Sequence, residues 1–215
     1  MHSRNFLPIV AAFLLVTGCA TTPSPPAGES EADAVAAAPF NELGSLDAPV
    51  LIIEFSDLQC SFCARHASQT FPELRRNYID TGKLRYAVRD LPLPMHAQAV
   101  PAAVAARCAG EQGKFWEMRQ AIYLSRGRLD LEPYAQMARE LGLDVERLEA
   151  CRRDGRQLEK VRSDAALGAA EGIASTPAFV IGRIVGDEFQ GETVVGAKPY
   201  ALFAAKIEAL LGEER

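Results

Sequence analysis

Two cysteines separated by two residues, in Cys60-Ser61-Phe62-Cys63, are the residues of this chain best suited to chemistry. They stand where an apolar run gives way to a helical pattern. The free amides and the dipole of a helix N-terminus stabilise a thiolate there, and a thiolate can exchange electrons with the disulfides of other proteins. We therefore expect Cys60 to be the exposed attacking sulfur with a lowered pKa. Cys63, one turn further on, would be the buried resolving thiol.

A carboxylate lies just ahead of this motif, because Glu54 interrupts the apolar run that begins at Val50. A charged side chain in a buried strand is costly unless it has a partner or a function. One interpretation makes Glu54 a proton acceptor beneath the cysteines, taking the proton of Cys63 during exchange. The alternative is a residue at the end of the strand whose carboxylate reaches solvent.

The spacing of apolar residues and the positions of turn residues predict the elements that position these groups. The run Val50–Phe55 is typical of a buried strand, and the spacing of apolar residues from Ser61 to Tyr78 predicts a helix that Pro72 should kink. A second strand over 84–89 after such a crossover implies a parallel β-α-β unit. The rest is expected to comprise a helical region over 96–172 interrupted near Gly110, Gly127 and Gly142, a strand over 178–181, a hairpin partner within 182–196 and a closing helix over 200–211.

The N-terminus has the pattern of a targeting segment. The apolar stretch Phe6–Val16 is too short to span a bilayer as a mature helix, so residues 1–18 are predicted to be a signal peptide. Val16-Thr17-Gly18-Cys19 resembles the lipobox of bacterial lipoproteins, in which the cysteine is lipidated. The alternative is an ordinary secretory leader that leaves Cys19 free. Residues 19–39, rich in Pro, Ala, Ser, Thr and acidic residues, predict a disordered tether.

We therefore expect an exported protein anchored to a membrane by its lipid, on the periplasmic side of the bacterial envelope. Ala20 rather than Asp after the cysteine points, by resemblance to Gram-negative sorting, to the outer membrane. Lipidation of Cys19 leaves four cysteines, and an even count in an exported protein suggests two disulfides. The second would join Cys108 and Cys151, stabilising the fold by roughly 4 kcal/mol on the chain-entropy estimate. The alternative is two buried cysteines without a bond.

Composition sets the class of protein. The 215 residues are 48% hydrophobic and 24% charged, with a net charge of −5, which fits one globular domain with an elaboration. The charges are mixed in sign along the chain and form no basic stripe, so no nucleic-acid partner is expected. The predicted units are 40–95 together with 173–215, and a helical insertion over 96–172.

With these elements in place, the residues resemble the DsbA-like branch of the thioredoxin superfamily. The likeness runs from about Leu43 to Leu211 and implies an α/β fold, a thioredoxin fold with an inserted helical subdomain. The residues that carry it are Asp47-Ala48-Pro49-Val50, Glu54-Phe55-Ser56-Asp57, Cys60-Ser61-Phe62-Cys63, Tyr78-Ile79-Asp80-Thr81-Gly82-Lys83, Arg89-Asp90-Leu91-Pro92-Leu93, Cys108-Ala109, Gln112-Gly113-Lys114-Phe115-Trp116 and Ser175-Thr176-Pro177-Ala178-Phe179.

The resemblance implies a catalytic disulfide at Cys60 and Cys63, with Glu54 as the acid. Pro177 should follow a cis bond and lie beside the disulfide, where Thr176 backbone groups would pair with an extended substrate. A proline directly before a strand suits a cis turn in any case. Trp116 is expected in the core of the helical region.

The family implies a protein thiol–disulfide oxidoreductase whose partners are protein thiols or disulfides and a redox recycling partner. Ser61 and Phe62 depart from the Pro and His common between the cysteines, so oxidation of substrates and their reduction or reshuffling both stay open.

Two other functions compete with this one. Soft thiolates suit copper(I), so a thioredoxin-fold copper-binding assembly factor could use Cys60 and Cys63, with His66 as a third ligand. We expect His66 to be a helix-surface residue instead. The remaining histidines are scattered and Ala64 excludes haem attachment, so neither a metal site nor a cofactor is predicted. A lipoprotein scaffold with a dispensable disulfide is the other hypothesis.

Overall fold

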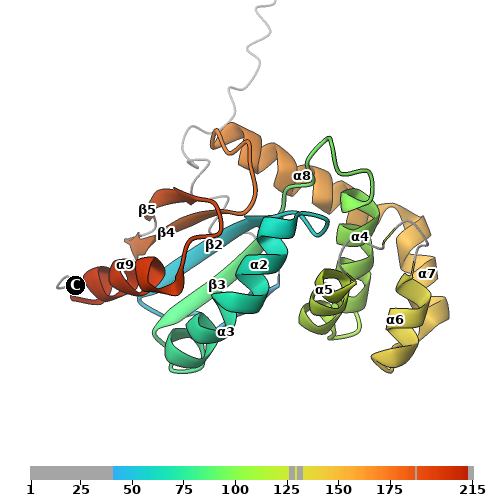
Figure 1. Cartoon of the computed structure of the whole chain (residues 1–215), viewed down its shortest axis with the longest axis horizontal. Helices are drawn as coiled ribbons and strands as arrows, with labels where there is room; N and C mark the ends of the chain where they lie inside the picture. Colours follow the sequence, from blue (N-terminus) through green and yellow to red (C-terminus); the bar gives the residue numbers. More distant parts are fainter. Residues whose placement is uncertain (1–40, 126–128, 130–132, 187, 213–215) are drawn as a thin grey trace, which may run out of the picture.

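A five-stranded sheet forms the centre of the molecule, with helices on both faces and further helices beside it (Figure 1). The computed structural model describes residues 41–125, 129, 133–186 and 188–212. The predicted signal peptide, Cys19, the tether and Gly127 lie outside these residues. Within the described ranges, no helix combines the length and apolar composition needed to cross a bilayer.

The sheet has the strand order β1-β3-β2-β4-β5. Strand β2 is parallel to β3 and antiparallel to β4, and β4 is antiparallel to β5. The predicted strands and the parallel β-α-β unit are therefore confirmed, and the region 182–196 supplies the end of β4 and the hairpin partner β5. The strands are β1 (Glu42–Leu43), β2 (Val50–Ser56), β3 (Leu84–Asp90), β4 (Ala178–Val185) and β5 (Glu188–Val195).

Alternation along the central strand decides which face of the sheet each side chain meets. Val50 and Ile52 belong to the larger apolar core, whereas Leu51, Ile53 and Phe55 belong to a smaller core on the opposite face. Every residue of β2 is buried. In this alternation Glu54 lies on the same side of the strand as Val50 and Ile52. Its carboxylate therefore points toward the face that carries the two motif cysteines.

Helices cover the sheet and build the region beside it. Figure 1 shows α2, α3 and α9 along one face, and the long α8 running past the sheet toward the remaining helices. Gly168 of α8 lets this helix approach closely, since a Cβ there would lie 3.2 Å from the Phe55 ring. The helices are α2 (Ser61–Gln69), α3 (Phe71–Leu74), η1 (Arg75–Ile79), α4 (Ala99–Gly110), α5 (Phe115–Leu124), α6 (Tyr134–Glu140), α7 (Val145–Asp154), α8 (Arg156–Ala170) and α9 (Tyr200–Gly212).

The segment 61–78 differs from the single kinked helix that the sequence predicts. Helix α2 ends before Thr70, and Pro72 lies in the first turn of the separate helix α3. A proline is tolerated there because the amide it lacks would have no helical partner. The chain continues as the π-helix η1.

Two contacts fix the helical region to the sheet and to itself. Arg107 of α4 forms buried ion pairs with Asp90 of β3 and Asp164 of α8. Cys108, the next residue, forms a disulfide with Cys151 of α7, with Cα atoms 5.8 Å apart.

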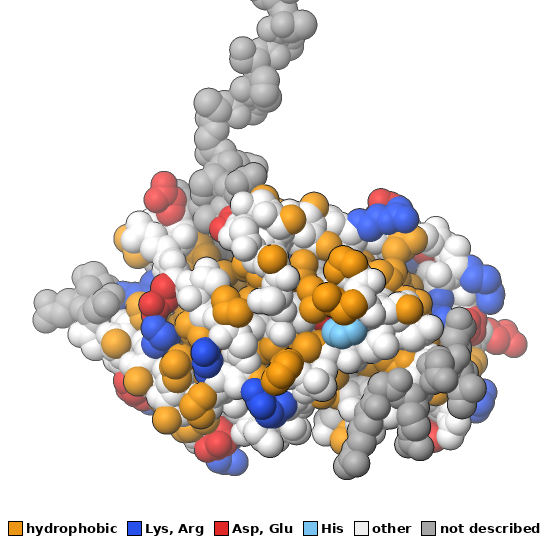
Figure 2. All heavy atoms as spheres, turned by 45° about the horizontal axis from the view of Figure 1, so that its top comes forward, with side chains coloured by type: hydrophobic (Ala, Val, Ile, Leu, Met, Phe, Trp, Pro, Cys, Tyr) orange, Lys and Arg blue, Asp and Glu red, His pale blue; other side chains and the backbone are white. Residues whose placement is uncertain are grey.

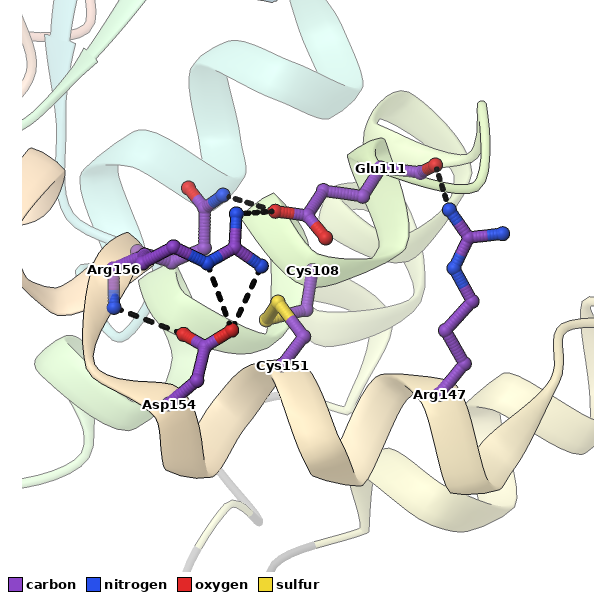
Figure 3. Close-up of polar contacts among 7 residues, drawn as sticks. Cys108, Glu111, Arg147, Cys151, Asp154 and Arg156 are labelled. Carbon is purple, nitrogen blue, oxygen red and sulfur yellow. Dashed lines mark hydrogen bonds and ion pairs between the residues drawn. A yellow bond between two sulfur atoms is a disulfide. The ribbon is translucent and has the colours of Figure 1, made fainter.

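Polar contacts surround this disulfide (Figure 3). The Glu111 carboxylate accepts hydrogen bonds from Arg156 and Gln157 at 3.2 and 2.6 Å, and its backbone carbonyl accepts one from Arg147 at 3.2 Å. Arg156 also pairs with Asp154 at 2.7 Å. The end of α4 is thereby joined to α7 and to the start of α8.

Candidate active site

The two motif cysteines lie at the N-terminal end of α2. Cys60 is the N-cap residue, with extended backbone, and Cys63 is the third residue of the helix. Both are free thiols in this structure. Cys63 has no exposed surface and Cys60 retains 5%. The order of exposure is the predicted one, but Cys60 is more buried than expected, because the loop before β4 covers it.

That loop brings Thr176 to the Cys60 sulfur. The thiol of Cys60 donates to the Thr176 carbonyl oxygen at 3.6 Å. The Thr176–Pro177 peptide bond is cis, and Pro177 directly precedes β4. The Thr176 hydroxyl is buried and has no other hydrogen-bond partner among the described residues, so it can turn to a thiolate at Cys60.

The surroundings of the two sulfurs push their pKa values apart. A hydrogen bond from the Cys63 thiol lowers the pKa of Cys60 to about 5, aided by the Thr176 side chain and by backbone amides and opposed by burial. Burial raises the pKa of Cys63 well above its usual value, and the Cys60 sulfur and the Glu54 carboxylate raise it further. At neutral pH the reduced pair therefore carries one thiolate, on Cys60, and one thiol, on Cys63.

Glu54 is fully buried beneath Cys63, which rules out the alternative of a carboxylate that reaches solvent. Its oxygens accept hydrogen bonds from Arg119 at 2.6 and 2.7 Å and from the Tyr86 hydroxyl at 2.8 Å. Burial raises the pKa of Glu54, but the Arg119 charge, with His66 and the hydroxyl donors, lowers it more, so the net pKa lies below the usual value. Glu54 is thus an ionised and weak base.

Sequence reasoning missed Arg119, which α5 places in this network. It lies on the apolar face of its helix, among Phe115, Met118 and Ile122, all buried. A charged residue at such a position is the signal that could have identified it, because the helix period assigns Arg119 to the core. Its guanidinium lies 5.1 Å from the Tyr123 ring centre and 5.7 Å from that of Trp116.

His66 is not the helix-surface residue that the sequence suggested. It is buried between Phe179 and Phe203, at 4.5 and 5.4 Å between ring centres. Burial lowers its pKa to about 4, so the imidazole is neutral at pH 7. Nε2 lies 3.1 Å from the Tyr86 hydroxyl oxygen. Because that hydroxyl donates to Glu54, Nε2 carries the hydrogen and donates to Tyr86.

Apolar side chains surround the redox motif at the surface. Phe62, inside the motif, is 54% exposed, and Met95 and Leu124 are more exposed still. Met95 belongs to a loop held against the motif, where the Asp57 carboxylate accepts from the Leu93 amide and pairs with His96, both at 2.8 Å. Figure 2 shows hydrophobic side chains across the middle of one face, with charged side chains mostly toward its edges.

A groove of about 920 Å³ runs between α2 and α3 on one side and α5 on the other. Ser61 of the motif and Leu124 are among the residues that line it, and Arg65 and Arg75 contribute positive charge. Trp116, which we expected in the helical core, is half-buried and lines this groove, with its ring stacked on Phe71 at 5.4 Å. The described residues contain no cluster of three His, Cys, Asp or Glu side chains with the spacing of metal ligands.

Comparison with known proteins places this geometry in a family. Residues 40–195 match the family model described as Thioredoxin. The structure of α-DsbA1 from Wolbachia pipientis is 28% identical, with a TM-score of 0.72 over 80% of this chain and 90% of that one. DsbA2 of Pseudomonas aeruginosa is 26% identical, with a TM-score of 0.64 over 79% and 92% of the two chains.

Curated sequences add relatives of two kinds. An Na(+)/H(+) antiporter NhaA of Herminiimonas arsenicoxydans is 36% identical over 152 residues, which are 70% of this chain and 24% of the antiporter. The chain therefore spans about a quarter of the length of that relative. A protein named as a protein-disulfide oxidoreductase in Rickettsia conorii is 33% identical over 106 residues, 49% of this chain and 36% of that one.

The matched region includes the sheet, the redox motif and the helical insertion, and the solved relatives share their arrangement over most of both chains. The chain belongs to the thioredoxin family, and among the solved structures its fold is similar to that of DsbA proteins.

Proposed function

We propose that this protein exchanges thiols and disulfides with exported proteins through Cys60 and Cys63. The observation that carries the proposal is the placement of the Cys60 sulfur at the start of α2, between the Cys63 thiol behind it and Thr176 beside it. This arrangement gives one stabilised thiolate facing the substrate side and one protonated thiol in reserve, which is what two-step exchange requires.

In the oxidising direction, a substrate thiolate attacks the Cys60 sulfur of the Cys60–Cys63 disulfide. A bond forms between the substrate and Cys60, the bond to Cys63 breaks, and Cys63 leaves as a thiolate that takes up a proton. A second substrate thiolate then attacks the substrate sulfur of the mixed disulfide and releases Cys60 as a thiolate. The substrate has lost two electrons and the enzyme pair has gained them, so a separate redox partner must remove them.

The low pKa of Cys60 favours this direction. A thiolate with a pKa near 5 stabilises the reduced pair about 100-fold at pH 7 relative to a thiol that stays protonated. A stabilised reduced form makes the disulfide a stronger oxidant. Phe62 supplies no charge for this purpose, and hydrogen bonds to the sulfur from Cys63, Thr176 and the backbone supply the stabilisation instead.

Protein substrates fit the surface around the motif. Phe62 exposes apolar area within the motif, Leu124 does so in the groove that Ser61 also lines, and Met95 does so in the loop bonded to Asp57. Exposed apolar area of this kind suits contact with a partly folded chain. Thr176 would pair through its backbone with an extended substrate segment, and Pro177 would keep that edge beside the sulfur. Glu54 would pass on the proton of Cys63 only transiently, because its lowered pKa returns it to the anion.

Trapping the mixed disulfide tests the exchange chemistry. Cys63→Ser should accumulate a covalent complex between Cys60 and a reduced, unfolded substrate protein after oxidation with dithionitrobenzoate, and Cys60→Ser should form none. Cys108→Ala with Cys151→Ala should behave like the wild type. A complex that forms equally well through Cys63 would overturn the assignment of the attacking sulfur.

The proposed site of action follows from the sequence of residues 1–39. An exported chain anchored through a lipid on Cys19, at the outer membrane, would act on envelope proteins. Mass spectrometry of the protein from bacterial membranes should find a lipidated N-terminal Cys19, and Cys19→Ala should release it from the membrane fraction. An unmodified N-terminus, or one that begins after Cys19, would contradict the anchor and leave the exchange chemistry intact.

A further inference from the structure

Arg119 connects the helical insertion to the redox centre through one buried contact. Its Nη2 lies 2.6 and 2.7 Å from the two oxygens of Glu54 and 3.2 Å from the Ser56 hydroxyl. Glu54 belongs to the central strand β2, whereas Arg119 belongs to α5. The ion pair therefore spans the boundary between the sheet and the insertion, directly beneath Cys63.

The surroundings of Arg119 leave it little freedom. Only 3% of the residue is exposed, and the rings of Tyr123 and Trp116 lie against its guanidinium. Its Nε has no hydrogen-bond partner among the described residues. The carboxylate of Glu54 thus receives the strongest interaction that this side chain makes.

A contribution to the stability of the fold does not by itself account for a buried ion pair of this kind. Removing two charges from water costs about as much as their attraction returns, and apolar residues of similar size often serve as well. Its position suggests a different purpose, because an unpaired carboxylate at Glu54 would face Cys63 across the core and oppose any negative charge on the two sulfurs.

We propose that Arg119 is a positioning residue of the exchange reaction. It holds Glu54 as an anion beneath Cys63, and its positive charge offsets the negative charge of that carboxylate when the Cys60 thiolate forms. The inference rests on the proposed exchange through Cys60 and Cys63. The groups that face Glu54 are Arg119 and Tyr123 from α5, Tyr86 from β3, Ser56 from its own strand, and His66 and Cys63 from α2. Arg119 is the one permanent cation in this set.

The reaction used for the test is reduction of the enzyme by glutathione. Two glutathione molecules give up two electrons and become glutathione disulfide, and the Cys60–Cys63 disulfide becomes a Cys60 thiolate and a Cys63 thiol with release of one proton. With Glu54 ionised in both forms, the equilibrium constant for this reduction rises about tenfold per pH unit between pH 6 and 8.

Arg119→Met should change that slope. Burial then raises the pKa of the unpaired Glu54, and the Cys60 thiolate raises it further in the reduced enzyme, so reduction takes up a proton at Glu54 while releasing one from Cys60. The slope should fall toward zero over the pH window in which Glu54 titrates. Arg119→Lys, which keeps the charge, should retain most of the tenfold slope.

The double variant Glu54→Gln with Arg119→Met should recover the tenfold slope, because it removes the titrating group and leaves no buried charge. Glu54→Gln alone keeps an unopposed cation near the sulfurs and should increase the equilibrium constant for reduction at least fivefold over the double variant. If Arg119→Met alone fails to fold, the comparison of Glu54→Gln with the double variant still tests the proposed role of Arg119. Arg75→Met, which removes an exposed charge from the wall of the same groove, serves as the control and should match the wild type.

A wild-type slope in Arg119→Met, or equal constants in Glu54→Gln and the double variant, would overturn the proposal and leave Arg119 a structural contact. Failure of the proposed function has a different signature. In that case the wild-type Cys60–Cys63 pair would not equilibrate with glutathione at any pH, whatever residue stood at position 119.

Discussion

The Thr176 carbonyl oxygen lies 3.6 Å from the Cys60 sulfur, although the two residues are 116 positions apart in the chain. The antiparallel pairing of β2 with β4 produces this contact, because Phe55 near the end of β2 lies opposite Ala178 at the start of β4, so the loop before β4 reaches the motif that follows β2. The Thr176 hydroxyl has no other partner among the described residues. Thr176 thus offers an acceptor to the Cys60 thiol and a donor to its thiolate.

Thr176→Val should therefore raise the pKa of Cys60 by about one unit, since valine keeps the shape and loses the hydroxyl donor. The thiolate absorbance at 240 nm of the reduced protein, followed against pH, measures the shift. Thr70→Val is a matched control, because the Thr70 hydroxyl bonds to the Lys198 carbonyl at the other end of α2. Equal shifts in the two variants would mean that the hydroxyl of Thr176 does not reach the thiolate.

Alkylation should separate the two sulfurs of the reduced enzyme. Iodoacetamide should modify Cys60 first, with a rate that levels off above about pH 6, because the pKa of Cys60 is about 5. Cys63 should stay unmodified through pH 8, because burial raises its pKa and no surface of it is exposed. Cys63→Ala should move the plateau for Cys60 upward, since the Cys63 thiol donates the hydrogen bond that lowers the pKa most.

Local patterns were sufficient for much of this fold. The period of the strands, the helical spacing after the motif and the turns at Gly110 and Gly142 predicted elements at the positions where the structure has them. They could not predict the break at Thr70, because a proline in a helical pattern is compatible with either a kink or a new first turn. Packing of the segment against its neighbours decides between these.

The same distinction between local patterns and tertiary packing applies to the residues of the site. Cys60 and Cys63 were identified from their spacing and from the strand before them, and Glu54 from its conflict with an apolar run. Arg119 and the burial of His66 depend on contacts between distant elements, which no local pattern specifies. The exposure of Cys60 was overestimated for this reason too, because the residues that cover it come from the loop before β4.

The Cys108–Cys151 disulfide should contribute to stability rather than to exchange. The two residues are 43 positions apart, and closing a loop of that length lowers the entropy of the unfolded chain by an amount worth about 4 kcal/mol. Cys108→Ala with Cys151→Ala should lower the free energy of unfolding, measured with urea, by up to about this amount. The rate of exchange with glutathione should stay within about twofold of the wild type, since Cys60 and Cys63 lie outside this loop. A loss of stability below about 1 kcal/mol would place the contribution of the helical contacts above that of the bond.

His66 should make the stability of the protein depend on pH between about 4 and 6.5. Burial lowers its pKa from 6.5 to about 4, so the unfolded chain binds a proton over this range while the folded protein does not. Acid therefore favours unfolding, and the free energy of unfolding should fall by up to about 3 kcal/mol through this group as the pH drops across the window. His66→Phe removes the titrating ring and keeps an aromatic side chain between Phe179 and Phe203, so its urea midpoint should decline less steeply with acid than that of the wild type. Parallel curves for the two proteins would mean that His66 is already protonated in the folded state, which its hydrogen bond from Nε2 to Tyr86 and its buried Nδ1 without a partner among the described residues argue against.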